Sequence, residues 1–322
     1  MPLIPNSKYK PFHFFKSGHF NTIYAATYKK HPTPIYKRKR IQTPDNDFFD
    51  VDWLQNSNNK YCVLLLHGLF GNSTSSYIRN TADYFFKNGY DVCAMNYRGE
   101  SGEPNNKPHA YHAGFTDDVE QLINEIKQLD KYQHIIPIGF SLGGSILLNY
   151  LCKVHQPNDA FIKCAAAISA PLYLTEGAYL LNQKNNWLYW YYFKQKINRT
   201  AHLKKEQFLN AGIDFYALLA ADNFFKVDTL YTAKVFGFES ALDYYEKASV
   251  LPHLTNLKTP TLLLNALDDM MLGHNSYPAV LADQHEHLFF EMSKFGGHLG
   301  FNQKGKQYYT ERVKWFVQFY NQ

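Results

Sequence analysis

The stretch that decides the fold of this chain is Ile135-Ile136-Pro137-Ile138-Gly139-Phe140-Ser141-Leu142-Gly143-Gly144-Ser145-Ile146-Leu147-Leu148. An apolar run ends in Gly-x-Ser-x-Gly, and apolar residues at helical spacing follow at once, which predicts a strand, a sharp turn and a helix. The turn strains the serine backbone, and Gly139 and Gly143 leave room where a side chain would collide with neighbouring elements. The five-residue pattern alone also occurs in ordinary turns, but its flanks favour a nucleophile elbow. Ser141 is therefore the predicted nucleophile.

Around this stretch the chain alternates between strands and helices, which predicts a mostly parallel sheet covered on both faces. Residues 1 to about 40 are expected to be irregular. The predicted strands are 36–43 and 48–54, which form a hairpin, followed by 61–66, 91–96, 135–140, 162–169, 260–265 and 287–292. The predicted helices are 76–87, 116–129 with Thr116 as its N-cap, 141–152 and 308–320.

The alternation stops between residues 172 and 249, where the sequence is helical and rich in aromatic residues. We expect a helical cap at 172–249, inserted between the two parts of an α/β core at 1–171 and 250–322. Such a cap would enclose an apolar acyl or alkyl group over the nucleophile. An equally good interpretation is that the aromatic rings form the core of the cap itself. The side chains expected to bind substrate are Phe70, Trp187 and Trp190.

A serine hydroxyl needs an imidazole to take its proton and a carboxylate to orient that imidazole. After an elbow of this kind, the acid and then the histidine follow along the chain. Asp268 comes just after the predicted strand 260–265, and we favour it over its neighbour Asp269 as the acid. His298 is the predicted base, because the small residues around it let the backbone bring its ring to the sheet edge. Weaker candidates, interpreted as groups that brace loops, are His19, His67, His109 and His112.

An acyl-transfer site also needs N–H donors for the oxyanion of a tetrahedral intermediate. The backbone N–H of Leu142, directly after the nucleophile, is one predicted donor. The loop after strand 61–66 supplies the other, from Leu69, with Phe70 as the second choice. Gly68 and Gly71 fit a loop whose backbone approaches the substrate closely.

Composition narrows the class of protein further. The 322 residues carry a net charge of +5, which is spread along the chain except for the run 37–40, interpreted as the solvated face of a strand rather than a nucleic-acid site. The four cysteines stand singly, so buried reduced thiols are expected, and no metal or cofactor motif is present. Neither a signal peptide nor a membrane-length apolar run is evident. These features predict a cytoplasmic protein that acts on a small molecule without a metal or cofactor.

The motifs together resemble those of the YheT-like family of α/β-hydrolases, and the resemblance runs nearly end to end. It implies an α/β-hydrolase fold, a triad of Ser141, Asp268 and His298, and carboxylesterase activity. Two departures concern pocket shape, since the family usually has Cys where Glu100 stands and Pro-Phe where Met270-Met271 stands. Besides the elbow, the motifs that carry the resemblance are Gly18-His19-Phe20-Asn21-Thr22-Ile23, His67-Gly68-Leu69-x-Gly71, Asn96-Tyr97-Arg98-Gly99, Ser101-Gly102-Glu103-Pro104-Asn105, Tyr111-His112-x-Gly114, Asp243-Tyr244-Tyr245 with Ser249, Asp268-Asp269 and Gly296-Gly297-His298-x-Gly300-Phe301.

Three functional hypotheses follow. The first is a serine hydrolase that cleaves short- to medium-chain carboxylic esters through an acyl-enzyme on Ser141. The second is an acyltransferase that passes the acyl group to an alcohol, or a lipase acting on monoacylglycerols or phospholipids, as some members of the family do. The third is a ligand-binding module without catalysis, in which Met270-Met271 misplace the acid.

Overall fold

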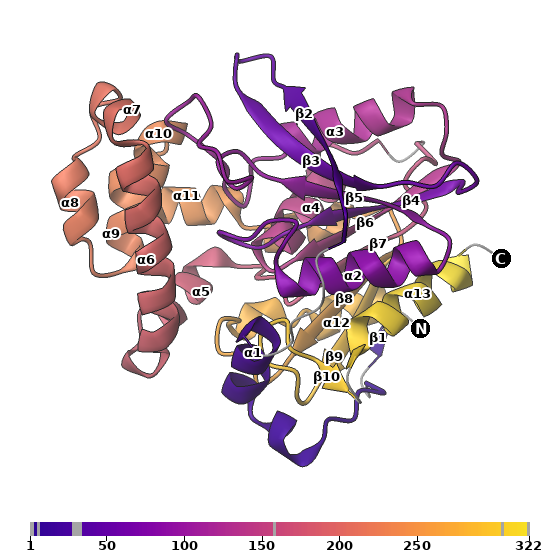
Figure 1. Ribbon diagram of the computed structural model, residues 1–322. Coiled ribbons are helices and arrows are strands. Elements are labelled where there is room, and N and C mark those ends of the chain that lie inside the picture. Colours follow the sequence, from indigo (N-terminus) through magenta and orange to yellow (C-terminus); the bar gives the residue numbers. More distant parts are fainter. Residues whose placement is uncertain (1–2, 5–6, 28–33, 157–158, 304–305, 321–322) are drawn as a thin grey trace.

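The computed structural model describes residues 3–4, 7–27, 34–156, 159–303 and 306–320, and a nine-stranded sheet forms the centre of the molecule (Figure 1). In spatial order the strands are β1, β9, β8, β7, β6, β4, β5, β3 and β2. β3 is antiparallel to both β2 and β5, and the other pairs are parallel, so the predicted sheet and its opening hairpin are confirmed. The strand bounds are Leu3–Ile4 (β1), Lys37–Gln42 (β2), Phe48–Leu54 (β3), Tyr61–Leu66 (β4), Asp91–Asn96 (β5), His134–Phe140 (β6), Ala165–Ile168 (β7), Thr261–Ala266 (β8) and Leu288–Ser293 (β9).

Apolar runs form the central strands because helices cover both faces of the sheet. In β4, Leu64 and Leu66 belong to one apolar cluster, whereas Val63 and Leu65 belong to the other. Function must therefore come from the loops at the strand ends. The helices on one face are α3 (Asp117–Gln128), α4 (Leu142–Lys153) and α12 (Ala279–Gln284), and those on the other are α2 (Ser76–Lys87) and α13 (Tyr308–Tyr320). Short 3₁₀-helices at Leu251–Asn256 and His274–Ser276 and the strands β10 (Asn302–Gln303) and β11 (Lys306–Gln307) complete this part.

The amino-terminal segment is more regular than predicted. In its described part, the structure contains β1, the 3₁₀-helix His13–Lys16 and helix α1 (Gly18–Thr27). β1 has two residues and gains its hydrogen bonds from β9, which a sequence pattern does not reveal. α1 packs against the loop after β8, where a Cβ on Gly18 would lie 2.0 Å from the carbonyl oxygen of Asp268. The secondary structure and position of this segment therefore depend on contacts with distant parts of the chain.

Residues 172–249, all of which the structure describes, form helices and turns without a β-strand; we call them the helical insert. In Figure 1 the helical insert lies beside one end of the sheet, at the left. It has an apolar cluster of its own around Phe208, Phe215 and Leu218. Its elements are α5 (Leu174–Leu181), the 3₁₀-helix Lys184–Asn186, α6 (Trp187–Leu203), α7 (Lys205–Asn210), α8 (Phe215–Ala220), α9 (Phe224–Val227), the π-helix Asp228–Ala233, α10 (Lys234–Phe236) and α11 (Ala241–Ala248).

Several smaller expectations can be compared with the structure. Thr116 precedes α3 as predicted, although its hydroxyl makes no capping hydrogen bond. The four cysteines are free and buried, as expected. Among the described helices, none combines the length and the apolar character needed to cross a membrane. The basic run is exposed along edge strand β2, and three of its four cations are paired with acids: Arg38 with Asp52, Lys39 with Glu125, and Arg40 with Asp50 and Glu103.

Replacing Gly143 with alanine should destabilise the protein by about 1–3 kcal/mol. A Cβ at this position would lie 2.4 Å from the carbonyl oxygens of both Leu66 and His67, so β4 and α4 would have to move apart. Urea or thermal unfolding measures the loss. Gly177→Ala is the control, because its Cβ would meet nothing closer than the Met271 carbonyl oxygen at 3.3 Å. Equal losses in the two variants would contradict this account of the elbow.

Candidate active site

The predicted elbow is present between β6 and α4. β6 ends at Phe140, α4 begins at Leu142, and Ser141 between them has φ 52° and ψ −124°. The glycines allow the turn, since a Cβ on Gly139 would lie 2.4 Å from the carbonyl oxygen of Gly143. The Ser141 N–H donates a hydrogen bond of 2.9 Å to the Ile168 carbonyl of β7, which fixes the turn to the sheet. The serine side chain therefore sits at the carboxyl edge of the parallel strands.

A hydrogen-bonded chain of three side chains meets at this edge. His298 Nε2 lies 2.7 Å from Ser141 Oγ, and His298 Nδ1 lies 2.8 Å from Asp269 Oδ2. With its proton on Nδ1, the imidazole donates to the carboxylate and accepts from the serine hydroxyl. The three residues come from the loops after β6, β8 and β9. These strands are parallel and lie in the order β9, β8, β7 and β6 in the sheet. The structure thus brings together residues that are far apart in the sequence.

The acid beside the imidazole is Asp269, so the preference for Asp268 was wrong. β8 ends at Ala266 and the chain turns at once, with the Asp269 N–H donating to the Ala266 carbonyl at 3.1 Å. Adjacent side chains in such a turn point in different directions. The carboxylate of Asp269 is buried against His298, and its Oδ1 also accepts a 2.9 Å hydrogen bond from the Met271 N–H.

Asp268 instead supports the histidine loop. Its Oδ1 accepts a 2.8 Å hydrogen bond from the Gly297 N–H, one residue before His298. Burial raises the pKa of the Asp268 carboxyl to about 6, with the nearby Asp269 charge adding to the rise. The two adjacent acids therefore have different environments, one against the imidazole and one against the backbone that carries it.

Helix α1 holds the same loop from the other side. The His298 N–H donates to Thr22 Oγ1 at 2.8 Å, and the Thr22 hydroxyl donates to the Gly18 carbonyl at 2.8 Å. Asn21 Oδ1 accepts a 2.7 Å hydrogen bond from Asn302 Nδ2, farther along the loop. Sequence reasoning gave these residues no role, although the motif 18–23 was part of the family resemblance. Gly18, Asn21 and Thr22 lie within about one turn of α1, which explains why they occur together in one motif.

The two predicted oxyanion donors lie next to the serine. A Cβ on Gly68 would lie 3.0 Å from Ser141 Cβ, so the loop after β4 passes directly over the serine. The Phe70 N–H already donates to Tyr111 Oη at 2.9 Å, whereas no described residue accepts a hydrogen bond from the Leu69 N–H. Leu142 is the first residue of α4, where backbone N–H groups point out of the helix. The geometry favours Leu69 over Phe70 as the second donor.

The other candidate histidines brace loops. His67 is fully buried, its Nδ1 lies 2.7 Å from the Gly68 carbonyl, its Nε2 accepts from the Tyr97 N–H at 3.1 Å, and burial lowers its pKa to about 4. His112 Nδ1 accepts from the Gly114 N–H at 3.1 Å, and burial lowers its pKa to about 3. His19 Nδ1 lies 2.9 Å from Tyr189 Oη and joins α1 to the helical insert. Among the described residues, none of these three rings is hydrogen-bonded to Ser141.

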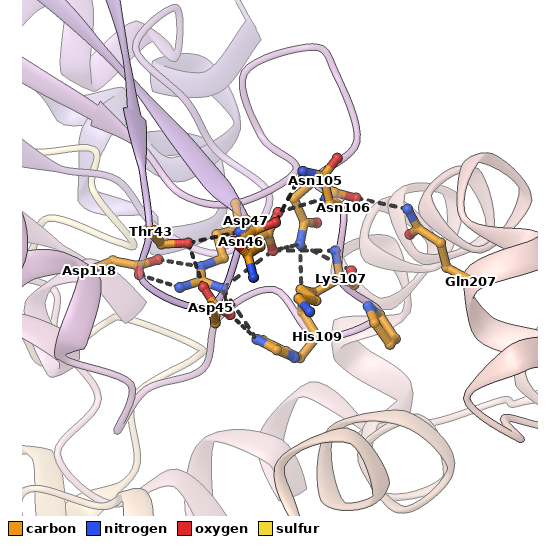
Figure 2. A network of polar contacts seen from close by, with 12 residues as sticks. Thr43, Asp45, Asn46, Asp47, Asn105, Asn106, Lys107, His109, Asp118 and Gln207 are labelled. Carbon is orange, nitrogen blue, oxygen red and sulfur yellow. Dashed lines mark hydrogen bonds and ion pairs between the residues drawn. The ribbon is translucent and has the colours of Figure 1, made fainter.

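A polar network fixes the loop that follows β5, and Figure 2 shows Asp45, Asp47 and Asp118 within it. The Arg98 guanidinium makes two hydrogen bonds with Asp118, at 2.7 and 2.8 Å, and pairs with Asp45 at 2.6 Å and with Asp47 at 3.3 Å. Asp45, Asp47 and His109 are close enough together to hold a metal ion. Asp45 and Asp47 are already engaged by Arg98, and Asp47 also accepts hydrogen bonds from Asn105 Nδ2 and the Asn106 N–H, so the cluster ties the loop after β5 to the turn between β2 and β3.

Two cavities open onto Ser141 and His298. The larger, of about 460 Å³, lies between α1 and α6, and the smaller, of about 110 Å³, lies under α5. Their walls are mainly apolar. The side chains that α6 contributes to the larger cavity are Leu188, Tyr189, Tyr192 and Phe193, and α5 contributes Leu174, Ala178 and Leu181 to the smaller one.

The tryptophans expected to bind substrate lie elsewhere, so that expectation was wrong. Trp187 is 60% exposed, and Trp190 packs on Phe224 with ring centroids 5.3 Å apart. Neither lines the described cavities at Ser141. The helical period of α6 turns positions 188, 189, 192 and 193 toward the site and leaves the tryptophans off that face. Phe70, in contrast, lines a third cavity beyond the oxyanion loop.

Comparisons with known proteins agree with this geometry. A family model described as alpha/beta hydrolase fold matches residues 61–304. The chain is 28% identical to YheT of Escherichia coli (strain K12), a protein with an esterase name, over 92% of this chain and 87% of that protein. It is 30% identical to phospholipase ABHD3 of Bos taurus, over 89% of this chain and 72% of that protein. The solved structure of the Pyrococcus furiosus esterase Pf2001 resembles it with a TM-score of 0.59 at 19% identity, over 88% of this chain and 90% of that chain.

Fold, elbow and family match agree on the class of protein, which is an α/β-hydrolase. Within that class, similarity over nearly the whole length makes the chain a member of the YheT-like family, as the sequence motifs indicated. Its relatives are esterases and lipases by name, which places it among hydrolases.

Exchanging each acid for its amide should separate the two aspartates. We expect Asp269→Asn to lower kcat for ester hydrolysis by about 10⁴-fold, because an amide facing Nδ1 favours the wrong tautomer of His298. Asp268→Asn keeps an oxygen for the Gly297 N–H and should cost far less. Steady-state kinetics on an aryl ester make the comparison. A larger loss from Asp268→Asn than from Asp269→Asn would contradict the assignment.

The raised pKa of Asp268 predicts a pH dependence of stability. Its pKa is 3.8 in the unfolded chain and about 6 in the folded protein, so the folded state holds the proton more tightly. Its contribution to stability is complete below the unfolded pKa and is lost as the pH rises through the folded pKa. The free energy of unfolding of wild type, relative to Asp268→Asn, should therefore fall between those two pH values and stay constant above them. A difference that rises over this window would contradict the burial argument.

Proposed function

We propose that the protein is a serine hydrolase that cleaves carboxylic esters of short to medium acyl chain length through an acyl-enzyme on Ser141. The observation that carries the proposal is the 2.7 Å contact between Ser141 Oγ and His298 Nε2, with Asp269 on the other ring nitrogen. In this reading Ser141 is the nucleophile, His298 the general base and acid, and Asp269 the residue that orients the ring.

The mechanism follows from the positions of these groups. Ser141 Oγ attacks the acyl carbonyl while His298 Nε2 takes the hydroxyl proton, and the carbonyl oxygen becomes an oxyanion held by the N–H groups of Leu69 and Leu142. Collapse of this intermediate breaks the ester bond, and His298 gives its proton to the leaving alcohol. Water then attacks the acyl-enzyme by the same route, which releases the acid and restores the serine.

Cavity shape supports an ester with an apolar arm. The smaller cavity at Ser141 is enclosed by aliphatic side chains of α5 and by Phe193 and Met271, and its modest size suits a short or medium chain. The larger cavity between α1 and α6 leaves room for the other arm. The backbone N–H of Met271 donates to Asp269 Oδ1 at 2.9 Å, so Met270-Met271 is compatible with an acid that faces His298.

Lipase action on a glycerol-based ester is the second candidate. The observation that favours it is the 30% identity to a protein named phospholipase, together with the apolar walls of both cavities. The reaction at Ser141 would be the same, and only the alcohol arm of the substrate would differ. Comparing hydrolysis of monoacylglycerols and phospholipids with that of simple alkyl esters of equal acyl length distinguishes the two candidates.

Ser141→Ala should lower kcat for aryl ester hydrolysis by about 10⁴-fold or more, because no other group takes over the covalent step. The rates of hydrolysis of aryl esters with increasing acyl chain length are measured for wild type and variant under the same conditions. Ser145→Ala is the control, since Ser145 lies one helical turn along α4 and donates to the Pro171 carbonyl at 2.6 Å. Full activity in Ser141→Ala would remove the proposed function.

A further inference from the structure

Glu100 is a half-buried carboxylate that the proposed mechanism does not use. It lies in the loop after β5 and lines a cavity of about 140 Å³ between the sheet edge and the helical insert. This cavity shares part of its wall with the smaller cavity at Ser141, so the two adjoin. The side chains common to both are Leu69, Leu142, Phe224, Asp228 and Tyr244.

One oxygen of the carboxylate is engaged. The Tyr111 hydroxyl donates to Glu100 Oε1 at 2.8 Å, and the same hydroxyl accepts the Phe70 N–H at 2.9 Å. This chain joins Glu100 to the loop that carries the Leu69 donor. Among the described residues, no other side chain or N–H donates to Glu100, so the second oxygen has its acceptor capacity left for a ligand.

The nearby cations do not pair with Glu100. Lys196, Lys204 and Arg199 are close enough to lower its pKa, yet no described cation lies within ion-pair distance of its carboxylate. Lys204 Nζ donates to Asn105 Oδ1 at 2.7 Å and to the carbonyl oxygens of Lys107 and Pro108. These three hydrogen bonds use all three of its protons. Burial outweighs these cations and raises the pKa of Glu100 to about 7.

A purely structural role would not need a carboxylate. Bracing Tyr111 takes one acceptor oxygen, which an amide supplies without the cost of burying a charge. A half-satisfied acid that faces a cavity next to reacting groups is typical of a binding site. The three surrounding cations disfavour a positively charged ligand there, so a neutral donor is the better complement.

We propose that Glu100 binds a hydroxyl group on one arm of the ester, in the cavity beyond the oxyanion loop. The proposal rests on the proposed function, because it names the substrate class of the same site. A hydroxyl donates to the free carboxylate oxygen, and the apolar wall from Ile197, Phe208 and Leu218 packs along the carbon chain that carries it. The hydroxyl belongs either to the alcohol arm or to the far end of the acyl arm.

Matched ester pairs test this subsite. One pair is butyl butyrate and its analogue with a hydroxyl at the end of the butyl arm, and the other is ethyl hexanoate and its analogue with a hydroxyl at the end of the acyl arm. We expect wild type to favour the hydroxylated member of one pair by about 10-fold in kcat/KM, and that pair identifies the arm. No preference within either pair would overturn the proposal.

The variant Glu100→Gln isolates the free oxygen. Glutamine keeps an oxygen for Tyr111 and replaces the other with an NH₂ group, which cannot accept from a hydroxyl. The hydroxyl can then only accept a neutral hydrogen bond from that NH₂ group, which is weaker than donating to a carboxylate, so the kcat/KM ratio within the responsive pair should fall severalfold. Tyr111→Phe is the matched control. It releases the Phe70 N–H, which should lower kcat/KM for both esters of the pair by the same factor and leave their ratio unchanged. A ratio that is undiminished in Glu100→Gln would overturn the proposal.

Binding measurements keep the subsite separate from the reaction. In Ser141→Ala, calorimetry should show tighter binding of the hydroxylated ester, and the difference should grow between about pH 6 and about pH 8 as Glu100 ionises. The titratable and charged groups around Glu100 are Tyr77, Arg98, Tyr111, His112, Tyr192, Lys196, Arg199, Lys204, Asp228, Tyr231 and Tyr244. Hydrolysis that persists in Ser141→Ala would remove the proposed function alone. Equal binding of both esters at both pH values would remove the subsite alone.

Discussion

The hydrogen bond between His298 and Ser141 is the interaction on which the rest of the site depends. It requires the loops after β6, β8 and β9 to end at one edge of the sheet, and the register of the parallel strands supplies that condition. It also requires the histidine loop to stay in place, which Asp268 secures through Gly297 and α1 secures through Thr22. The amino-terminal helix is thus part of the active site, although it contributes no reacting group.

The sequence predicted the parts of the fold that follow from apolar runs and from glycine. The central strands, the elbow at Ser141 and the position of His298 were all visible, because each depends on local spacing. The choice between Asp268 and Asp269 was not, since adjacent residues in a turn differ in direction and only the path of the chain after β8 decides which one meets the imidazole. α1 was missed for a similar reason, because the contacts that place it beside Asp268 and His298 are with residues more than 240 positions away.

The helical insert and the loop after β5 shape what can reach the serine. Aromatic residues in α6 were expected to face the substrate, but helical periodicity divides them between the site, the core of the insert and solvent. The loop after β5 is tied to α3 by the pair between Arg98 and Asp118, and to the helical insert by Lys204 and by Gln207, whose contact with Asn105 is drawn in Figure 2. It is therefore fixed from both sides. A rigid loop of this kind can hold one polar side chain, Glu100, in an otherwise apolar cavity.

The proposed function requires Ser141 to be an activated nucleophile, and covalent labelling examines this most directly. A fluorophosphonate probe reacts with a serine only when a base takes its proton and donors stabilise the oxyanion. We expect one probe per chain, located on Ser141 by mass spectrometry of the digested protein, with labelling that slows strongly when His298 is replaced by alanine. A chain that stays unlabelled, or one labelled on a different residue, would contradict the account.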